Sequence, residues 1–306
     1  MKKIYLFILL FIFFNNYAYS AKFEIKDINN YQSKDNLDCS KDDGAVSKNN
    51  IEYYHTNFWN FKALKKYKEG KSLGTCIYKD GSGWYWTAAR LVNDPKGSPV
   101  SWVQPTYQIG SSPWQRSLDV TYSKDNKNFP LKVGNINSLN FNYNYSSIGK
   151  GFYNHNLTLW FKKNNLVSKA EYEVMLKFNG PQVVKHLRNP YCNKMGSGSK
   201  FLDDLELKNI TYKVCFKSLE RNLLESKTKG GTRDFGTVVM YPKNINQKNT
   251  EFNIQLDIAK VINYLILNNI ITKEYILPGL EINSEIWYGE EELKIKNLSY
   301  DLQLKN

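Results

Sequence analysis

Short runs of β-favouring residues, separated by turn residues, recur along almost the whole chain. Runs rich in Tyr, Trp, Val, Ile and Phe are cut by Gly, Asn, Asp and Ser, as in GTCIYKDGSGWYWTAARL, SLNFNYNYSS, HNLTLWFKK and ITYKVCF. Residues 79–83, KDGSG, carry the composition of a hairpin turn. Many short strands at close spacing are typical of a sandwich. The sequence therefore predicts an all-β fold, either a sandwich or a jelly roll.

One segment has the period of a helix instead of a strand. In LDIAKVINYLILNN the apolar residues recur at helical spacing, at Ile258, Val261, Ile262, Leu265 and Ile266. Asp257 precedes them as a candidate N-cap, and two asparagines follow. This pattern predicts one amphipathic helix over about residues 257–268, packed on the outer face of a sheet.

The first twenty residues have the character of a secretory signal peptide. Lys2 and Lys3 precede a short apolar run, and Ala18-Tyr19-Ser20 offers small residues for cleavage after Ser20. The run is too short for a membrane span, which needs about 20 apolar residues. We expect a secreted protein, not held in the membrane after signal removal. Residues 21–306 are predicted to form a single domain, with 21–38 as a possible loose arm and 193–206 and 219–235 as surface loops.

The net charge is strongly positive, +13 over the whole chain. Removal of Lys2 and Lys3 with the signal leaves 13 − 2 = +11. Such a charge is compatible with nucleic acid or anionic surfaces as partners. The lysines are scattered and mixed with acids, which favours a solubilising surface, so we expect no nucleic-acid partner. We also expect a monomer. A basic surface-binding factor remains the alternative.

Four cysteines occur in the chain, and an even number in an exported protein suggests two disulfides. Three pairings are open, and pairing of neighbours in sequence, Cys39 with Cys76 and Cys192 with Cys215, is the simplest. The chain has three histidines, none in a ligand-spaced motif, and it has no CxxC pair. We therefore expect no metal.

The stretch AEYEVMLKF places an acid in an unusual position on a strand. Side chains alternate across a strand, so Tyr172, Val174, Leu176 and Phe178 share an apolar face. Glu173 lies on the other face beside Met175. A fully solvated face has little use for a methionine.

A second strand, EINSEIWYG, shows a similar arrangement. Glu281, Asn283, Glu285 and Trp287 share one face of that strand. Two carboxyl groups that face each other would suit a glycoside hydrolase, in which one attacks the sugar and the other protonates the leaving oxygen. An apolar neighbour such as Trp287 would raise a carboxyl pKa. The alternative is that these acids pair with lysines on an outer face.

Aromatic residues make up 15% of the chain, including seven tryptophans. Sugars present C–H faces that stack on aromatic rings, so a groove lined with Trp and Tyr is suited to a polysaccharide. A tryptophan-rich core gives the same composition, and a row of aromatic rings could also hold single-stranded nucleic acid.

The order of the motifs resembles glycoside hydrolase family 12, the small β-jelly-roll endoglucanases and xyloglucanases. TNFWN supplies Asn57 and Trp59 of the family's opening, a cysteine and a Trp-rich hairpin follow, and PVSWVQP contains Trp102. YEVMLKF is similar to the nucleophile strand, Tyr-Glu-(Leu/Ile/Val)-Met-(Ile)-Trp. LDIAKVINYL, YILPGLEINSEIWYG and EELKIKNLSYDLQL then resemble the family's helix, its Tyr-(Leu/Ile)-x-x-x-(Glu/Gln)-x-Gly-x-Glu strand and its closing strand. The likeness covers about residues 39–302.

The resemblance implies an all-β fold, a concanavalin-like β-jelly-roll sandwich of two antiparallel sheets. It also implies a secreted, retaining endo-β-1,4-glucanase. Glu173 would be the nucleophile and Glu285 the acid/base. Substrate-binding positions would be Asn57, Trp59, Trp102, Met175 and Trp287. The resemblance also implies the disulfide Cys39–Cys76, no cofactor, and cellulose-type β-glucan or xyloglucan as the substrate.

The sequence departs from the family next to the nucleophile. The family's Asp, which hydrogen-bonds the nucleophile, is replaced by Thr158, with Asn156 as another candidate partner. Lys177 stands near the place of the family's Trp. A non-catalytic jelly-roll protein that binds glycans is therefore the alternative function.

Overall fold

The computed structural model describes residues 37–40, 46–48, 53–59, 73–80, 83–90, 102–110, 129–163, 170–181, 192, 195, 198–229, 234–243 and 250–305. Among these residues, side chains are described from Gln104 onward, except at positions 105, 225–226, 228–229, 287–290 and 292. The expected signal peptide and most of the expected N-terminal arm lie outside the described residues.

The described chain is mostly β, as the sequence predicts. Its strands are β1 Leu37–Ser40, β2 Val46–Lys48, β3 Tyr53–Trp59, β4 Leu73–Asp80, β5 Gly83–Arg90, β6 Trp102–Gly110, β7 Leu131–Lys132, β8 Ile136–Phe161, β9 Tyr172–Asn179, β10 Lys200–Leu207, β11 Ile210–Lys217, β12 Gly236–Pro242, β13 Glu251–Asp257, β14 Ile276–Leu277 and β15 Gly279–Leu304. Its helices are the 3-10 turn η2 Val133–Asn135 and the α-helices α3 Leu219–Lys229 and α4 Ile258–Leu267.

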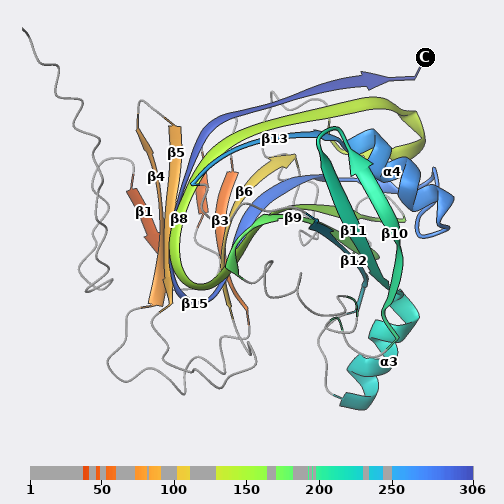
Figure 1. Cartoon of the computed structure of the whole chain (residues 1–306), viewed down its shortest axis with the longest axis horizontal. Coiled ribbons are helices and arrows are strands. Elements are labelled where there is room, and N and C mark those ends of the chain that lie inside the picture. The colour runs from red at the N-terminus through yellow and green to blue at the C-terminus, as the bar shows by residue number, and fades with distance from the viewer. Residues whose placement is uncertain are drawn as a thin grey trace, which may run out of the picture.

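Two strands of 26 residues each, β8 and β15, organise the fold. They pair antiparallel from Leu280 opposite Leu159 to Leu304 opposite Ile136. Both curl from one layer of the molecule into the other (Figure 1). In one layer β15 pairs with β6 and β8 with β9, and in the other β15 pairs with β5 and β8 with β13. The result is a two-layered jelly-roll sandwich.

The site layer, as we call the layer that contains β9, has the strand order β2-β3-β6-β15-β8-β9-β12-β11-β10. Every neighbouring pair in it is antiparallel except β9 with β12, which run parallel. The other layer has the order β1-β4-β5-β15-β8-β13. Asp80 pairs with Gly83, which confirms the hairpin turn predicted at residues 79–83.

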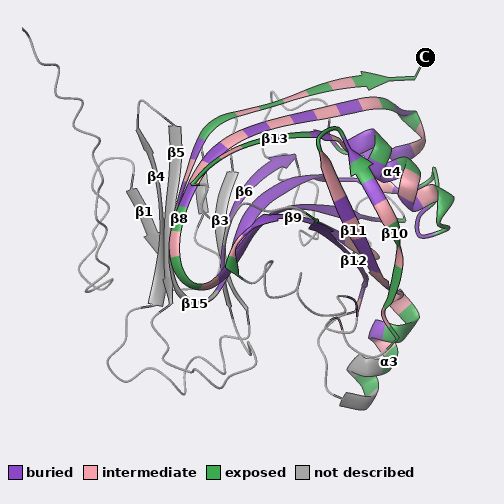
Figure 2. Cartoon of the chain, in the orientation of Figure 1, coloured by how far each residue is buried: buried purple, intermediate pink, exposed green. Residues whose placement is uncertain are grey.

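The main core lies between the layers, and both halves of β8 contribute to it. Leu139 and Phe141 come from the first half, Leu157 and Leu159 from the second, and all four are fully buried. Along β8, buried residues alternate with less buried ones in the first half and follow one another without interruption from Tyr153 to Phe161 in the second (Figure 2). The apolar residues of the alternating pattern thus face the core, and the polar residues between them lie on the outer face of the sheet.

The predicted helix is present as α4, and its start is the predicted cap: the Asp257 side chain accepts a hydrogen bond of 3.0 Å from the backbone N–H of Lys260. Its location corrects the expectation of an outer-face helix. Val261, Ile262 and Leu265 are buried within the main core cluster, and the helix contacts β8 and β10. α4 therefore packs on the core side of the sheet.

Two predicted loops also contain regular structure. Residues 200–207 of the expected loop 193–206 form β10, and residues 219–229 of the expected loop 219–235 form α3. β10 is an edge strand with exposed charged residues, so its sequence lacks a clear apolar alternation. Within the described residues, no helix is long and apolar enough to cross a bilayer.

Candidate active site

The outward face of the site layer carries a dense set of polar side chains. Because residues 157, 159 and 161 of β8 and 174, 176 and 178 of β9 point into the core, the intervening residues face the other way. We call this outward surface the polar face. Its described members are Gln104, Thr106, Gln108, Asn154, Asn156, Thr158, Trp160, Glu173, Met175, Lys177, Glu281, Asn283 and Glu285. All are buried except Glu173 and Glu285, which are half-buried and so mark the points that solvent reaches.

Glu173 lies near the start of β9, in the middle of the site layer. Its backbone pairs with Trp160 of β8 on one side and with Thr237 of β12 on the other. The structure thus places Glu173 on the outward face that its sequence alternation predicts. Glu173 is therefore a half-buried carboxyl on a strand that is paired on both sides.

Of the carboxyls Glu281 and Glu285 of β15, Glu281 is the one whose row lies nearer to that of Glu173. It pairs with Thr158 of β8, two residues from Trp160, which is about 7 Å along the strand. The Trp160 indole Nε1 donates a hydrogen bond of 2.8 Å to Glu281 Oε2. The side chain of Glu281 is 2% exposed.

The environment of Glu281 favours its protonated form. Burial raises the pKa of Glu281 to about 8, an effect that the Trp160 hydrogen bond reduces and the nearby Glu173 carboxylate reinforces. Among the described residues, no hydrogen-bond partner is found for Glu281 Oε1, which is buried. A buried carboxyl that holds its proton at neutral pH, next to a second carboxyl, has the arrangement of an acid paired with a nucleophile.

Glu285 occupies a different part of the polar face. It pairs with Asn154, six residues from Trp160 on β8, which is about 20 Å along the strand. Lys177 Nζ lies 2.6 Å from Glu285 Oε2, and Asn154 Nδ2 donates to the same oxygen at 2.8 Å. The expected acid/base role requires Glu285 to lie beside Glu173, and the register does not place it there.

A signal for Glu281 exists in the sequence. Gly279-Leu280-Glu281 matches the Gly-x-Glu of the family pattern, directly after YILP. Our sequence interpretation placed that Glu at Glu285, where Asn283 stands in place of the Gly. Strand alternation could not correct this choice, because Glu281 and Glu285 lie on the same face.

Thr158 and Asn156, the candidate partners of the nucleophile, belong to a buried amide network. The Thr158 hydroxyl accepts hydrogen bonds of 3.1 Å from Asn156 Nδ2 and from Asn283 Nδ2. Asn156 also donates to Asn283 Oδ1. Thr158 pairs with Met175 in the register, whereas the residue opposite Glu173 is Trp160.

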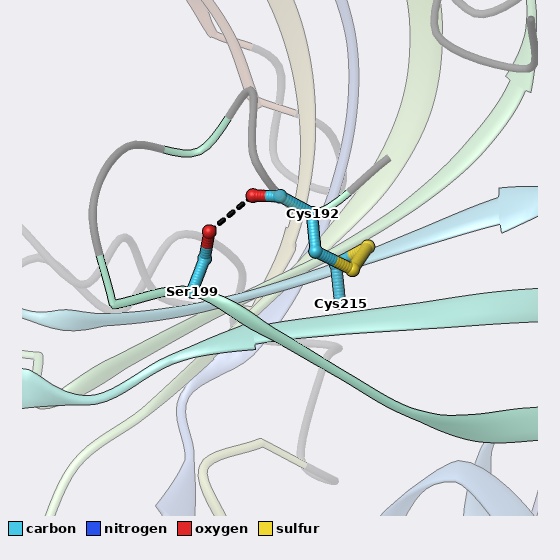
Figure 3. Close-up of a disulfide and its surroundings, with 3 residues drawn as sticks. All are labelled: Cys192, Ser199 and Cys215. Atoms are coloured by element: carbon cyan, nitrogen blue, oxygen red, sulfur yellow. Dashed lines mark hydrogen bonds between the residues drawn. A yellow bond between two sulfur atoms is a disulfide. The ribbon is translucent and has the colours of Figure 1, made fainter. Parts of the chain in front are cut away.

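Met175 lies beside a disulfide. It is 6% exposed and belongs to a buried cluster with Cys192, Cys215, Val239 and Tyr241. The predicted disulfide Cys192–Cys215 is confirmed, and the Ser199 hydroxyl donates to the Cys192 carbonyl (Figure 3). Lys217 Nζ donates to the Met195 carbonyl at 3.1 Å. Together these contacts hold residues 192, 195 and 199 against β11, which β12 separates from the strand that carries Glu173.

The remaining expected positions are described by backbone alone. Trp59 of β3 pairs with Trp102 of β6, and Asn57 pairs with Gln104. Trp287 falls at a register shift between Ile286 and Tyr288. Their side chains lie outside the described residues, so their sugar-binding roles stay predictions.

The second expected disulfide is also described by backbone alone. Cys39 of β1 and Cys76 of β4 are directly opposite in the register. Opposed residues of antiparallel strands have Cα atoms about 4.5–5.5 Å apart, within the span of a disulfide. The pairing Cys39–Cys76 stays a prediction. Within the described part of the chain, no group of three or more His, Cys, Asp or Glu residues is placed to hold a metal ion.

Comparisons with known proteins identify the fold. No family model and no curated protein matches the sequence. Among solved structures, a family 12 xyloglucanase from Bacillus licheniformis matches with a TM-score of 0.60 and 16% identity, over 87% of this chain and 100% of that chain. The endoglucanase Cel12A from Rhodothermus marinus matches with a TM-score of 0.59 and 15% identity, over 88% and 99%. Endoglucanase 3 from Trichoderma harzianum matches with a TM-score of 0.57 and 15% identity, over 89% and 100%. The chain therefore has the jelly-roll fold of the family 12 glycoside hydrolases, as its motif order predicts.

Proposed function

We infer that the protein is a secreted glycoside hydrolase that cleaves internal β-1,4 bonds of a cellulose-type β-glucan or a xyloglucan. The observation that carries this function is the pair of Glu173 and Glu281 on one face of the central strands. One carboxyl is accessible, and the other is buried with its pKa raised to about 8. The fold supports the proposal, because solved proteins of this fold include endoglucanases and xyloglucanases.

The chemistry follows the retaining double displacement. Glu173 attacks the anomeric carbon and forms a glycosyl-enzyme, while Glu281 donates its proton to the leaving oxygen. Glu281, now a carboxylate, takes a proton from water, which hydrolyses the intermediate and restores both groups. This route requires carboxyl groups about 5–5.5 Å apart. The rows of Glu173 and Glu281 are two residues apart along β8, which is compatible with that separation. The rows of Glu173 and Glu285 are six residues apart along β8, which is not.

The test combines activity with stereochemistry. The purified protein is incubated with soluble cellulose derivatives, xyloglucan and mixed-linkage β-glucan, and new reducing ends and viscosity are measured. We expect a fast fall in viscosity and products that first form with the β configuration by NMR. Glu173→Gln should abolish cleavage while the folded state is kept.

A glycan-binding protein without catalysis is the second candidate, favoured by Thr158 at the place of the family's Asp. It would bind the same glucans and release no reducing ends. Wild-type turnover by Glu173→Gln would refute the proposed hydrolase mechanism. An α-configured first product would refute the retaining route.

A further inference from the structure

An ion pair is built into the polar face away from Glu173 and Glu281. Lys177 is 3% exposed, and its ammonium group makes three contacts: 2.6 Å to Glu285 Oε2, 3.0 Å to Asn154 Oδ1 and 3.0 Å to Asn156 Oδ1. An ammonium has three N–H donors. The geometry therefore engages all of them with protein oxygens.

Such a pair is costly unless its charges serve a purpose. Removing two charges from water costs several kcal/mol per ion, and their attraction repays this only in good geometry. The two partners are not equally covered, because the side chain of Lys177 is 4% exposed and that of Glu285 is 12% exposed. The carboxylate is thus the more exposed member of a largely covered pair, and the ammonium is almost fully covered.

The row of Glu285 is rich in side-chain amides. Asn154 of β8 is its partner on one side. On the other side the register runs from Asn283 opposite Thr106 to Ile286 opposite Val103, which puts Gln104 opposite Glu285. Carboxylate and amide groups in one row offer the acceptors and donors that sugar hydroxyls use.

The row also lies at a useful distance from the proposed catalytic pair. Glu281 and Glu285 are four residues apart on the same face of β15, which is about 13 Å. One sugar unit does not cover such a span, whereas several linked units do. A glycan bound at Glu173 and Glu281 and lying along β15 would therefore reach Glu285.

We propose that Glu285 is a glycan-binding carboxylate, which accepts hydrogen bonds from the hydroxyl groups of a neutral sugar several units from the cleavage point. Lys177 is its positioning residue, which fixes the carboxylate and balances its charge without touching the sugar. This subsite rests on the proposed function, because it deepens the description of the same polar face. Because the pair is neutral overall, it favours neutral glucans over acidic polysaccharides.

The test measures binding as a function of glycan length. Glu173→Gln is the parent, so that hydrolysis does not consume the ligand, and its affinity for β-1,4-gluco-oligosaccharides from two to six units is measured by calorimetry. Addition of Glu285→Gln should weaken binding of the longest oligosaccharide about tenfold and that of the shortest less than about twofold, since a hydrogen bond to a charged group is lost only where the sugar reaches it.

Two further variants separate positioning from general damage. Lys177→Met in the same parent should weaken binding of the longest oligosaccharide in the same way. Glu285→Asp, which keeps the charge, should restore part of the affinity, and it replaces Glu285→Gln if that protein does not fold. Glu251→Gln is the matched control, because Glu251 pairs with Lys296 on the exposed surface, and it should leave binding at every length unchanged.

Failure of the subsite and failure of the hydrolase are distinguishable. Three results would overturn the subsite. Glu285→Gln could weaken binding equally at all oligosaccharide lengths, it could leave binding of the longest oligosaccharide unchanged, or the Glu173→Gln parent could bind no oligosaccharide. A wild type that cleaves β-glucan but shows no dependence on length leaves the hydrolase standing. A wild type that cleaves nothing, with a parent that still shows the length dependence, overturns the hydrolase and leaves the subsite.

Discussion

Glu281 and Glu285 lie four residues apart on one face of one strand, yet their surroundings are opposite. Glu281 contacts an indole N–H and lies near a second carboxyl, in a site that solvent hardly reaches. Glu285 contacts an ammonium and an amide, and it is partly exposed. One environment retains a proton, and the other retains a negative charge. Two identical side chains are thereby suited to different roles, proton transfer and ligand binding.

The largest effect should come from exchange of each carboxyl in turn for an amide. Glu281→Gln should lower kcat on β-glucan by about 10²–10⁴-fold, the usual contribution of a general acid. The loss should be smaller for an aryl glycoside, whose leaving group needs no proton. Glu285→Gln should cost about tenfold or less on β-glucan. Steady-state kinetics on both substrates check this, and the reverse ranking would show that Glu285 is the proton donor.

The second-largest effect should be a loss of folding stability when the ion pair of Lys177 and Glu285 is broken. Lys177→Met leaves Glu285 without its ammonium in a largely covered site, and loss of one partner of a buried pair costs about 3–5 kcal/mol. Denaturant unfolding of the variant and wild type measures this. The double variant Lys177→Met/Glu285→Gln should recover part of the loss, because no unpaired charge remains. A loss below about 1 kcal/mol would show that the pair behaves as a surface pair.

The pH dependence of stability should separate the two carboxyls. The pKa of Glu281 is raised from 4.5 to about 8 in the folded protein, so between these values the folded state holds a proton that the unfolded state releases. Its contribution is present below about pH 4.5 and is lost as the pH rises through 8. Glu281→Gln should therefore be more stable relative to wild type at pH 8 than at pH 5, in thermal unfolding. Glu285→Gln should be less stable at both, and a parallel response of the two variants would contradict the contrast.

The smallest effect concerns the indole hydrogen bond. The bond from Trp160 lowers the pKa of Glu281, so Trp160→Phe should raise that pKa further above 8. The alkaline limb of the kcat/KM profile should then move upward by less than about one pH unit. The phenyl ring keeps an apolar contact with Phe235, whose ring centroid lies 5.1 Å from that of Trp160. A pH–rate profile with a limb that moves downward would exclude Glu281 as the group that must be protonated.

Local periodicity predicted much of the fold, because strands and α4 bury one side of an alternating or helical pattern. It failed where few residues of an element are buried. β10 is an edge strand with charged residues, and α3 exposes Glu220 and Leu224, so neither shows a clear apolar pattern. The position of α4 depended on which side of the sheet the core occupies, which periodicity does not contain.

The candidate site was half predictable. Alternation alone put Glu173 on the outward face, since its neighbours on β9 are core residues. The choice between Glu281 and Glu285 depended on the register between β15 and β8, and alternation gives the same face for both. Cross-strand register is set by pairing of residues more than 120 positions apart, such as Glu281 with Thr158. The raised pKa of Glu281 likewise needs its three-dimensional neighbours.

The long pairing of β8 with β15 also dictates when the molecule can finish folding. Until residues 279–304 are in place, both layers lack a central strand, and β8 has an open edge along its length. Folds built on such distant contacts form slowly, and unpaired strand edges invite association with other chains. A chain that is synthesised from its N-terminus therefore cannot complete the sandwich until β15 has been made.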